Sequence, residues 1–249
     1  MKRWIALLLT ALALTNPASA AEISAAIAAN FSAPMKLIAA EFEKDTGHKV
    51  NLSFGATGTF YTQIHHGAPF QVLLSADDET TAKLEKEGKG VSGTRFTYAV
   101  GRLVLWSAKP GFIDSTGTVL KAGSFSHIAI ASPKLAPYGA AALQVLQKLN
   151  LVEAMRPKLV QGENILQTLQ FVSSGNAELG FVALSQVQEN GALKSGSAWI
   201  IPDNMYDSIQ QDALLLENGK SSAAAQALMV YLKSETAKKI ISRFGYRLP

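Results

Sequence analysis

The sequence predicts an α/β protein of two lobes, each a mostly parallel sheet flanked by helices. Short apolar segments that fit strands alternate with segments whose apolar residues recur at helical spacing, and this alternation is typical of parallel sheets. The alternation begins at residue 23 and begins again at residue 128, after a region rich in glycine and proline. The last segments fit one strand and two helices. We therefore expect two α/β lobes and a final segment that returns to the first lobe.

The first lobe is expected to begin with a strand, a loop and a helix. Pro34 suits the first turn of that helix, where its missing N–H is not needed, and Gly47 suits the helix end. The same unit then repeats with a glycine-rich turn at 55–59, and a third strand follows. The expected elements are strands at 23–28, 49–54 and 72–75 and helices at 34–46 and 60–66.

The middle of the chain is expected to form the second lobe. One long apolar strand covers residues 98–106, and a new series of strands and helices follows it. Further strands are expected at 128–131, 158–160, 179–183 and 198–201, and helices at 140–149 and from 163 to about 174.

The end of the chain is expected to complete the first lobe, with a strand at 213–216 and helices at 222–232 and 235–244. We infer that the chain crosses back near residues 203–208. Two crossings would form a hinge, and a hinge suits closure of the lobes around a ligand in the cleft between them. The expected division is 21–97 for the first part of lobe 1, 98–205 for lobe 2 and 206–249 for the return segment.

The first 20 residues fit a secretory signal peptide. Lys2 and Arg3 supply positive charge, residues 4–14 are apolar, and the small residues at 18–20 offer a cleavage site. We expect cleavage after Ala20. Because the chain has no cysteine that could carry a lipid anchor, we expect the mature protein in the periplasm of a Gram-negative bacterium.

Composition excludes several classes of protein. The absence of cysteine excludes disulfides, thiolate catalysis and cysteine-ligated metals. Without Lys2 and Arg3, 21 basic residues stand against 19 acidic ones, a net charge of +2. No basic stripe is interleaved with aromatic residues, so we expect no nucleic-acid partner. We expect a monomer.

Few residues suggest catalysis or a metal site. His65 and His66 are neighbours that would point about 100° apart on a helix, so they do not suit one metal ion. Asp77 and Asp78 resemble an acid pair but also fit a cap at a strand end. No Gly-x-Ser-x-Gly elbow is present. We therefore expect a binding protein and no cofactor, with a periplasmic α/β hydrolase as the alternative.

The candidate site lies in the loops that follow the expected strands. In a parallel sheet these loops meet at the carboxyl edge, where helix starts present free N–H groups and attract anions. The side chains there offer hydrogen-bond donors without full charge, although the same residue types also serve as ordinary helix caps. The loops carry Asn30, Ser32, Thr57, Thr59, Tyr138, Gly139, Asn164 and Ile165.

Uncharged donors suit a dianion that has four acceptor oxygens and no proton. Phosphate carries a proton at neutral pH and would want a carboxylate acceptor, which these loops do not obviously supply. Molybdate, tungstate and sulfate are therefore favoured, and the sequence does not separate them by size. Glu163 would repel such an anion, so we expect it to cap its helix and point outward.

Several motifs together resemble one known family, the molybdate-binding proteins of bacterial molybdate importers. The resemblance covers essentially the whole mature chain. Its most specific part is the Ser-Phe-Gly-Ala-Thr-Gly-Thr loop with the following Gly-Ala-Pro and Ser-Ala-Asp. The matching segments are residues 28–35, 53–59, 67–69, 75–77, 137–139, 163–165, 179–182, 231–234 and 243–246.

The resemblance implies a two-lobed carrier, not an enzyme, that clamps one oxyanion and delivers it to the membrane permease of an ABC importer. It implies contacts to molybdate, and to tungstate, from Asn30, Thr57, and the backbones of Tyr138 and Ile165. These residues would touch the oxygens of the anion, with no direct ligation of the metal. A carrier for sulfate or another small ligand is the alternative within binding proteins.

The chain departs from the family pattern at several positions. Asn30 and Thr57 stand where serine is common, and Gln71 stands where aspartate is usual. Ala183 occupies the place of a tyrosine whose hydroxyl touches the ligand in many members, whereas Tyr138 stands where those members carry a small residue. Our hypothesis is that the phenol has moved from one loop to the other.

Overall fold

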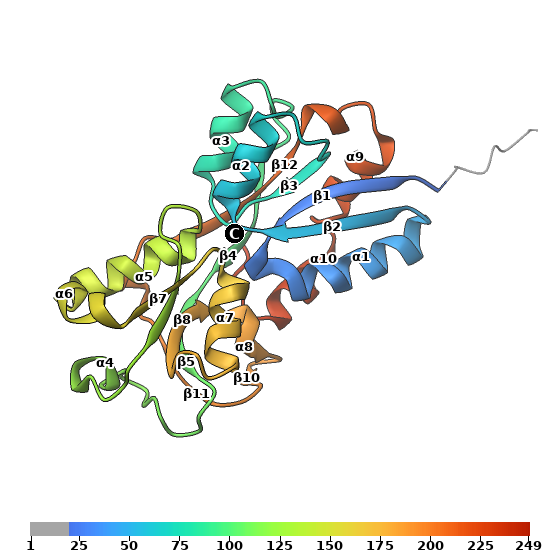
Figure 1. Cartoon of the computed structure of the whole chain (residues 1–249). Helices are drawn as coiled ribbons and strands as arrows, with labels where there is room; N and C mark the ends of the chain where they lie inside the picture. The colour runs from blue at the N-terminus through green and yellow to red at the C-terminus, as the bar shows by residue number, and fades with distance from the viewer. Residues whose placement is uncertain (1–19) are drawn as a thin grey trace, which may run out of the picture.

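The computed structural model describes residues 20–249 (Figure 1). The expected signal peptide therefore lies outside the described residues except for Ala20. The chain forms two five-stranded sheets, each covered by helices on both faces, in agreement with the two-lobed α/β fold predicted from the sequence. No helix within residues 20–249 is both long and apolar enough to cross a membrane.

The first sheet has the strand order β2-β1-β3-β12-β4. Its apolar side chains alternate between two cores, because successive residues of a strand face opposite sides of the sheet. Ile23, Ala25 and Ile27 of β1 pack under α1, α9 and α10, whereas Ala26 packs under α2 and α3. The strands are β1 (Glu22–Ala28), β2 (Lys49–Gly55), β3 (Val72–Leu74), β4 (Phe96–Gly101) and β12 (Ile209–Leu215). The helices are η1 (Ala29–Phe31), α1 (Ser32–Thr46), α2 (Thr57–His65), α3 (Glu79–Lys86), η4 (Glu217–Gly219), α9 (Ala223–Tyr231) and α10 (Glu235–Arg243).

The second sheet has the strand order β11-β5-β8-β6-β7, with α7 against β6, β7 and β8, and α5 also packed on the sheet. A short hairpin, β9–β10, follows α8. The strands are β5 (Leu103–Ser107), β6 (Ile128–Ala131), β7 (Leu159–Gly162), β8 (Leu179–Ala183), β9 (Gln188–Glu189), β10 (Ala192–Leu193) and β11 (Ser197–Ile200). The helices are α4 (Val119–Ala122), α5 (Pro137–Lys148), α6 (Val152–Met155), η2 (Arg156–Lys158), α7 (Ile165–Ser173), α8 (Leu184–Val187) and η3 (Asp203–Met205).

The chain crosses between the lobes at two places. The long strand expected at 98–106 is in fact two strands, since β4 pairs with β12 in the first sheet and β5 pairs with β8 in the second. The first crossing is therefore at Arg102, whereas the expected boundary after residue 97 falls inside β4. The return lies between β11 and β12, a connection that contains the expected boundary after residue 205.

In each sheet one strand runs against the other four, namely β12 in the first and β5 in the second. These are the strands that follow the two crossings. A strand that enters a sheet from the side of the other lobe starts at the edge where its parallel neighbours end, so it must run antiparallel to them. Both sheets are therefore mixed, with their parallel strands ending toward the junction of the lobes.

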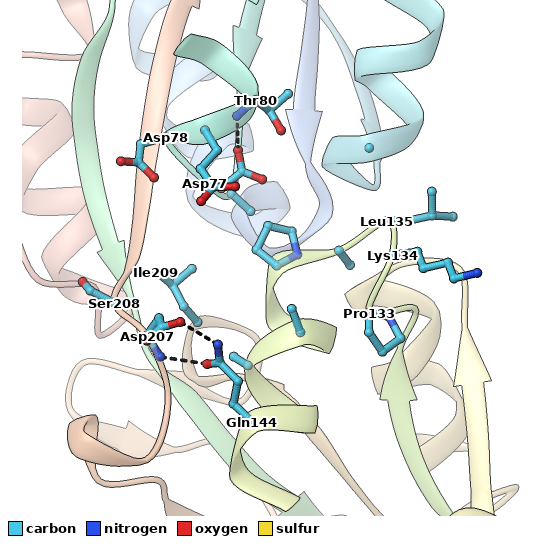
Figure 2. A pocket seen from close by; sticks show the side chains of 17 residues that line it. Asp77, Asp78, Thr80, Pro133, Lys134, Leu135, Gln144, Asp207, Ser208 and Ile209 are labelled. Atoms are coloured by element: carbon cyan, nitrogen blue, oxygen red, sulfur yellow. Dashed lines mark hydrogen bonds between the residues drawn. The ribbon is translucent and has the colours of Figure 1, made fainter. Parts of the chain in front are cut away.

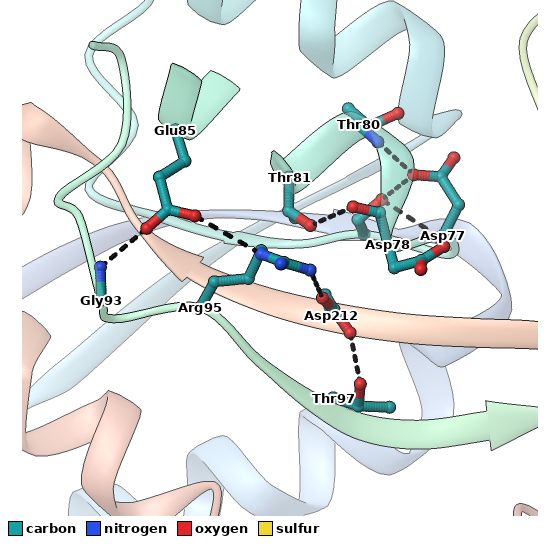
Figure 3. A network of polar contacts seen from close by, with 10 residues as sticks. Asp77, Asp78, Thr80, Thr81, Glu85, Gly93, Arg95, Thr97 and Asp212 are labelled. Carbon is teal, nitrogen blue, oxygen red and sulfur yellow. Dashed lines mark hydrogen bonds and ion pairs between the residues drawn. The ribbon is translucent and has the colours of Figure 1, made fainter. Parts of the chain in front are cut away.

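A bulge interrupts the pairing of β12 with β4. Gln211 lies opposite Ala99 and Asp212 lies opposite Thr97, so Tyr98 is the extra residue. The buried carboxylate of Asp212 accepts hydrogen bonds from Arg95 Nη1 and Thr97 Oγ1, both at 2.7 Å (Figure 3). Arg95 also lies 3.5 Å from a carboxylate oxygen of Glu85. These contacts hold Asp212 of β12 in place next to the bulge.

Replacing Arg95 with methionine should lower the free energy of unfolding by about 1–3 kcal/mol, because it leaves a buried carboxylate with a hydroxyl as its main partner. Water that reaches the 36% exposed Arg95 side chain limits the loss. The control is Arg156→Met, which removes a pair to Glu153 that is 69% and 78% exposed and should cost less than about 0.5 kcal/mol. Urea unfolding followed by circular dichroism measures the free energy of unfolding of both variants. Equal losses in the two variants would contradict a stabilising role of the buried pair between Arg95 and Asp212.

Candidate functional site

A small cavity lies where the two lobes meet, beside the carboxyl ends of strands from both sheets. Its volume is about 10 Å³. The structure brings all four site residues predicted from the sequence to its wall: Asn30 and Thr57 from the first lobe, and Tyr138 and Ile165 from the second. Each stands at or near the start of a helical segment, in η1, α2, α5 and α7 respectively.

The helix starts supply main-chain N–H groups, because the first turn of a helix has no intrahelical acceptors. In α7 the side chain of Asn164 accepts hydrogen bonds from the N–H groups of Leu166 and Gln167 at 3.0 and 3.1 Å. The N–H of Ile165 is left without an intrahelical acceptor. In α5 the first residue is Pro137, which has no N–H, so Tyr138 carries the first donor. The positive ends of several helix dipoles thus surround one cavity.

Thr57 adds a hydroxyl to these donors. Its Oγ1 accepts a hydrogen bond from the N–H of Ala76 at 3.0 Å, which leaves the hydroxyl hydrogen available to an acceptor in the cavity. The carboxamide of Asn30 behaves differently, since its Nδ2 donates to Gln211 Oε1 at 2.8 Å and to the hydroxyl of Tyr246 at 2.9 Å. Asn30 therefore has its main-chain N–H as its remaining donor.

The hydroxyl of Tyr138 lies in a buried polar cluster behind the cavity, where it accepts a hydrogen bond from Gln211 Nε2 at 3.1 Å. Tyr98 donates toward Gln211 Oε1 from 3.0 Å, and Tyr246 donates to the main-chain oxygen of Asn30 at 2.9 Å. The hydroxyl of Tyr138 thus forms a hydrogen bond with Gln211, whereas our hypothesis from the sequence is that it contacts the ligand.

Burial raises the pKa values of Tyr98, Tyr138 and Tyr246 above the usual range for a phenol. The three hydroxyls therefore keep their protons at neutral pH. Sequence reasoning missed this cluster. No local signal indicates it, because Gln211 stands in a run of three polar residues, 210–212, of which Gln210 is exposed and Asp212 is buried.

The residues that line the cavity lie between positions 28 and 165 of the chain. None of them carries a charge. Glu163 is exposed, as expected, and accepts a hydrogen bond from Thr59 of the other lobe at 3.4 Å. The expectation that it caps its helix is wrong, since Asn164 is the cap of α7. Among residues 20–249, no three His, Asp or Glu side chains are placed to hold a metal ion.

Main-chain contacts bring the lobes together beside the cavity. The N–H of Gly58 in α2 donates to the carbonyl of Leu135 in the second lobe at 2.9 Å. A Cβ atom at position 58 would lie 3.1 Å from the Cα of Leu135, so only glycine allows this approach without displacement. Ser185 adds a second link, since its hydroxyl donates to the main-chain oxygen of Asn30 at 3.0 Å.

A larger crevice of about 410 Å³ lies next to the cavity, also between the lobes (Figure 2). Its wall carries Asp77, Asp78 and Asp207, with Lys134 on the opposite side. Asp77 accepts a hydrogen bond from the N–H of Thr80 at 2.8 Å, so it caps the loop into α3. Burial raises the pKa of Asp77. Because carboxylates repel anions, the small uncharged cavity is the better anion site of the two.

Comparison with known proteins places the chain in a family. The family model described as "Bacterial extracellular solute-binding protein" matches residues 23–247. The chain belongs to this family. It is therefore a solute-binding protein and not an enzyme.

Molybdate-binding proteins are among the relatives of this chain. The molybdate-binding protein ModA of Azotobacter vinelandii is 61% identical over 94% of this chain and 93% of that protein. ModA of Rhodobacter capsulatus is 51% identical over 95% and 94%. The solved periplasmic molybdate-binding protein of Azotobacter vinelandii superposes with a TM-score of 0.88 at 41% identity, over 91% of this chain and 99% of that one. The family resemblance found in the sequence is confirmed.

Replacing Tyr138 with phenylalanine should lower the free energy of unfolding by about 1–3 kcal/mol, because the buried Nε2 of Gln211 loses its acceptor. The matched control is Tyr61→Phe, whose exposed hydroxyl donates to Glu87 at 2.9 Å and should contribute less than about 0.5 kcal/mol. Urea unfolding of the two variants measures the difference. A loss at Tyr138 no larger than at Tyr61 would count against the buried hydrogen bond.

Proposed function

We propose that this chain captures molybdate in the cavity between its lobes and delivers it to the membrane permease of an ABC importer. The observation that carries the proposal is the convergence of helix starts from both lobes on a cavity without charged side chains. Such a cavity suits an anion that needs hydrogen-bond donors and has no proton to give. The two ModA relatives, both molybdate-binding proteins, support molybdate as the ligand.

In this proposal four of the residues that line the cavity share the oxygens of one anion. Asn30, Tyr138 and Ile165 donate their main-chain N–H groups, and Thr57 donates its hydroxyl. The metal atom itself has no protein ligand. Tungstate has the same charge and tetrahedral shape, so we propose that it binds as well. The protein needs no cofactor and acts as a monomer.

We also propose a periplasmic location, reached through the signal peptide at residues 1–20 and its cleavage after Ala20. The solved relative from Azotobacter vinelandii is described as periplasmic. Detection of the mature protein mainly in the culture medium would count against this location.

Sulfate is the competing ligand, because it shares the charge and the absence of a proton. The sulfate-binding protein SubI of Mycobacterium tuberculosis has the same fold, with a TM-score of 0.73, but only 15% identity. A thermal-shift panel of molybdate, tungstate, sulfate and phosphate separates the candidates. At a free ligand concentration of 100 times Kd, binding adds about 2.7 kcal/mol of stability, which corresponds to a rise in Tm of roughly 5–10 °C. We expect this rise with molybdate and tungstate; a rise with sulfate alone would replace the ligand in the proposal.

Replacing Ile165 with proline tests a single donor. Proline is tolerated at the first position of a helix, and the preceding Asn164 is extended with φ −139° and ψ 173°, as a residue before proline prefers. The change removes one N–H from the cavity and should weaken molybdate binding by about 1.5–3 kcal/mol, or about 10- to 150-fold in Kd. Isothermal titration calorimetry measures the change.

The control for this variant is Ile165→Val, which trims the same buried side chain and keeps the N–H. We expect its Kd for molybdate to stay close to that of the parent protein. Equal Kd values for the proline and valine variants would remove Ile165 from the set of donors.

A further inference from the structure

The side chain of Gln211 is fully buried at the point where the two halves of the cavity meet. It touches a cavity residue from each lobe: Asn30 of the first lobe donates to its Oε1 at 2.8 Å, and its Nε2 donates to Tyr138 of the second lobe at 3.1 Å. Tyr138 is 1% exposed, so water does not compete for this hydrogen bond. One amide group therefore links the two walls of the cavity.

The position of Gln211 is fixed independently of the second lobe. The bulge at Tyr98 turns the hydroxyl of that residue toward Gln211 Oε1, at 3.0 Å. The next residue, Asp212, is held by Arg95 and Thr97 (Figure 3), and its main-chain oxygen accepts the N–H of Ser75 at 2.9 Å. Bulges of this kind commonly redirect side chains beside functional sites. Gln211 is thus a rigid feature of the first lobe that presents an N–H to the second.

Tyr138 connects this contact to the cavity. Tyr138 lines the cavity, and its hydroxyl reaches the first lobe at Gln211. A Cβ atom at Gly101, the last residue of β4, would lie 2.2 Å from this hydroxyl, so glycine at 101 makes the room that the phenol occupies. Separation of the lobes must break the hydrogen bond between Gln211 and Tyr138, because the two side chains belong to different lobes.

We propose that Gln211 is a positioning residue that orders Asn30 and, through Tyr138, holds the lobes closed over a bound anion. The inference rests on the function proposed above. Because the hydrogen bond across the lobes forms as they close, its loss should leave capture unchanged and speed release.

The test compares the kinetics of molybdate binding in Gln211→Met and in the parent protein. Methionine keeps the length of the side chain and removes its amide. Stopped-flow fluorescence should show a dissociation rate constant increased by roughly 10-fold, with an association rate constant within about 2-fold of the parent value. A purely structural role would reduce the fraction of active protein without changing the dissociation rate of the folded part.

The control is Gln210→Met, an exposed neighbour on the same strand, which should leave both rate constants unchanged. Tyr138→Phe removes the same hydrogen bond from the other lobe and serves as a second variant if Gln211→Met does not fold. It should also speed release, by no more than Gln211→Met, which in addition removes the acceptor of Asn30 and Tyr98. The double variant should release no more than about 3-fold faster than Gln211→Met alone, because both changes remove one interaction.

The outcomes separate the two proposals. If the parent protein binds no molybdate, the proposed function fails. If the parent binds and the variants release molybdate at the parent rate, or if the two changes multiply in the double variant, the role of Gln211 is overturned and the proposed function stands.

Discussion

Main-chain N–H groups at helix starts are the interaction on which this molecule depends. A buried anion is stable only when donors replace the water it has lost, and the cavity wall contributes no cationic side chain. In the proposed site the donors therefore come from helix starts and from the Thr57 hydroxyl, and those groups must point at one place. Two parallel-sheet lobes that face each other with their carboxyl edges meet this requirement, because every strand that ends there leads into a loop or helix beside the other lobe.

The path of the chain follows from that arrangement. Both crossings must pass the edge where the lobes meet, so each strand that follows a crossing enters its sheet there and runs backward. In this way β12 and β5 become the reversed strands. β12 then carries Gln211 close to the cavity, although no βα loop contributes it. The reversed strand thus places an interior side chain where the parallel strands can offer only loops.

Local patterns predict the fold class and the loops that reach the cavity, and the family resemblance then selects four candidate residues among them, all of which line the cavity. Helical spacing ends at Gly47, which adopts φ +75° as the cap of α1, and the site residues follow strands in a regular way. Residues 98–106 were predicted as one strand because β4 and β5 are both apolar. The two strands are distinguished only by their pairing, since β4 pairs in the first sheet and β5 in the second, with Arg102 between them. Glu163 and Asn164 were both plausible caps from their residue types alone. Gln211 could not be found locally, since its partners Asn30 and Tyr138 are 181 and 73 residues away in the chain.

The uncharged wall of the cavity also has an electrical consequence. Residues 20–249 carry 21 basic and 19 acidic side chains, a formal net charge of +2. Protonated phenols and main-chain amides take up or release no proton when an oxyanion binds. Both negative charges of a bound dianion are therefore added to the charge of the protein. The filled molecule is then close to neutral overall. Empty and filled forms consequently differ in their migration in an electric field and in their attraction to an acidic surface.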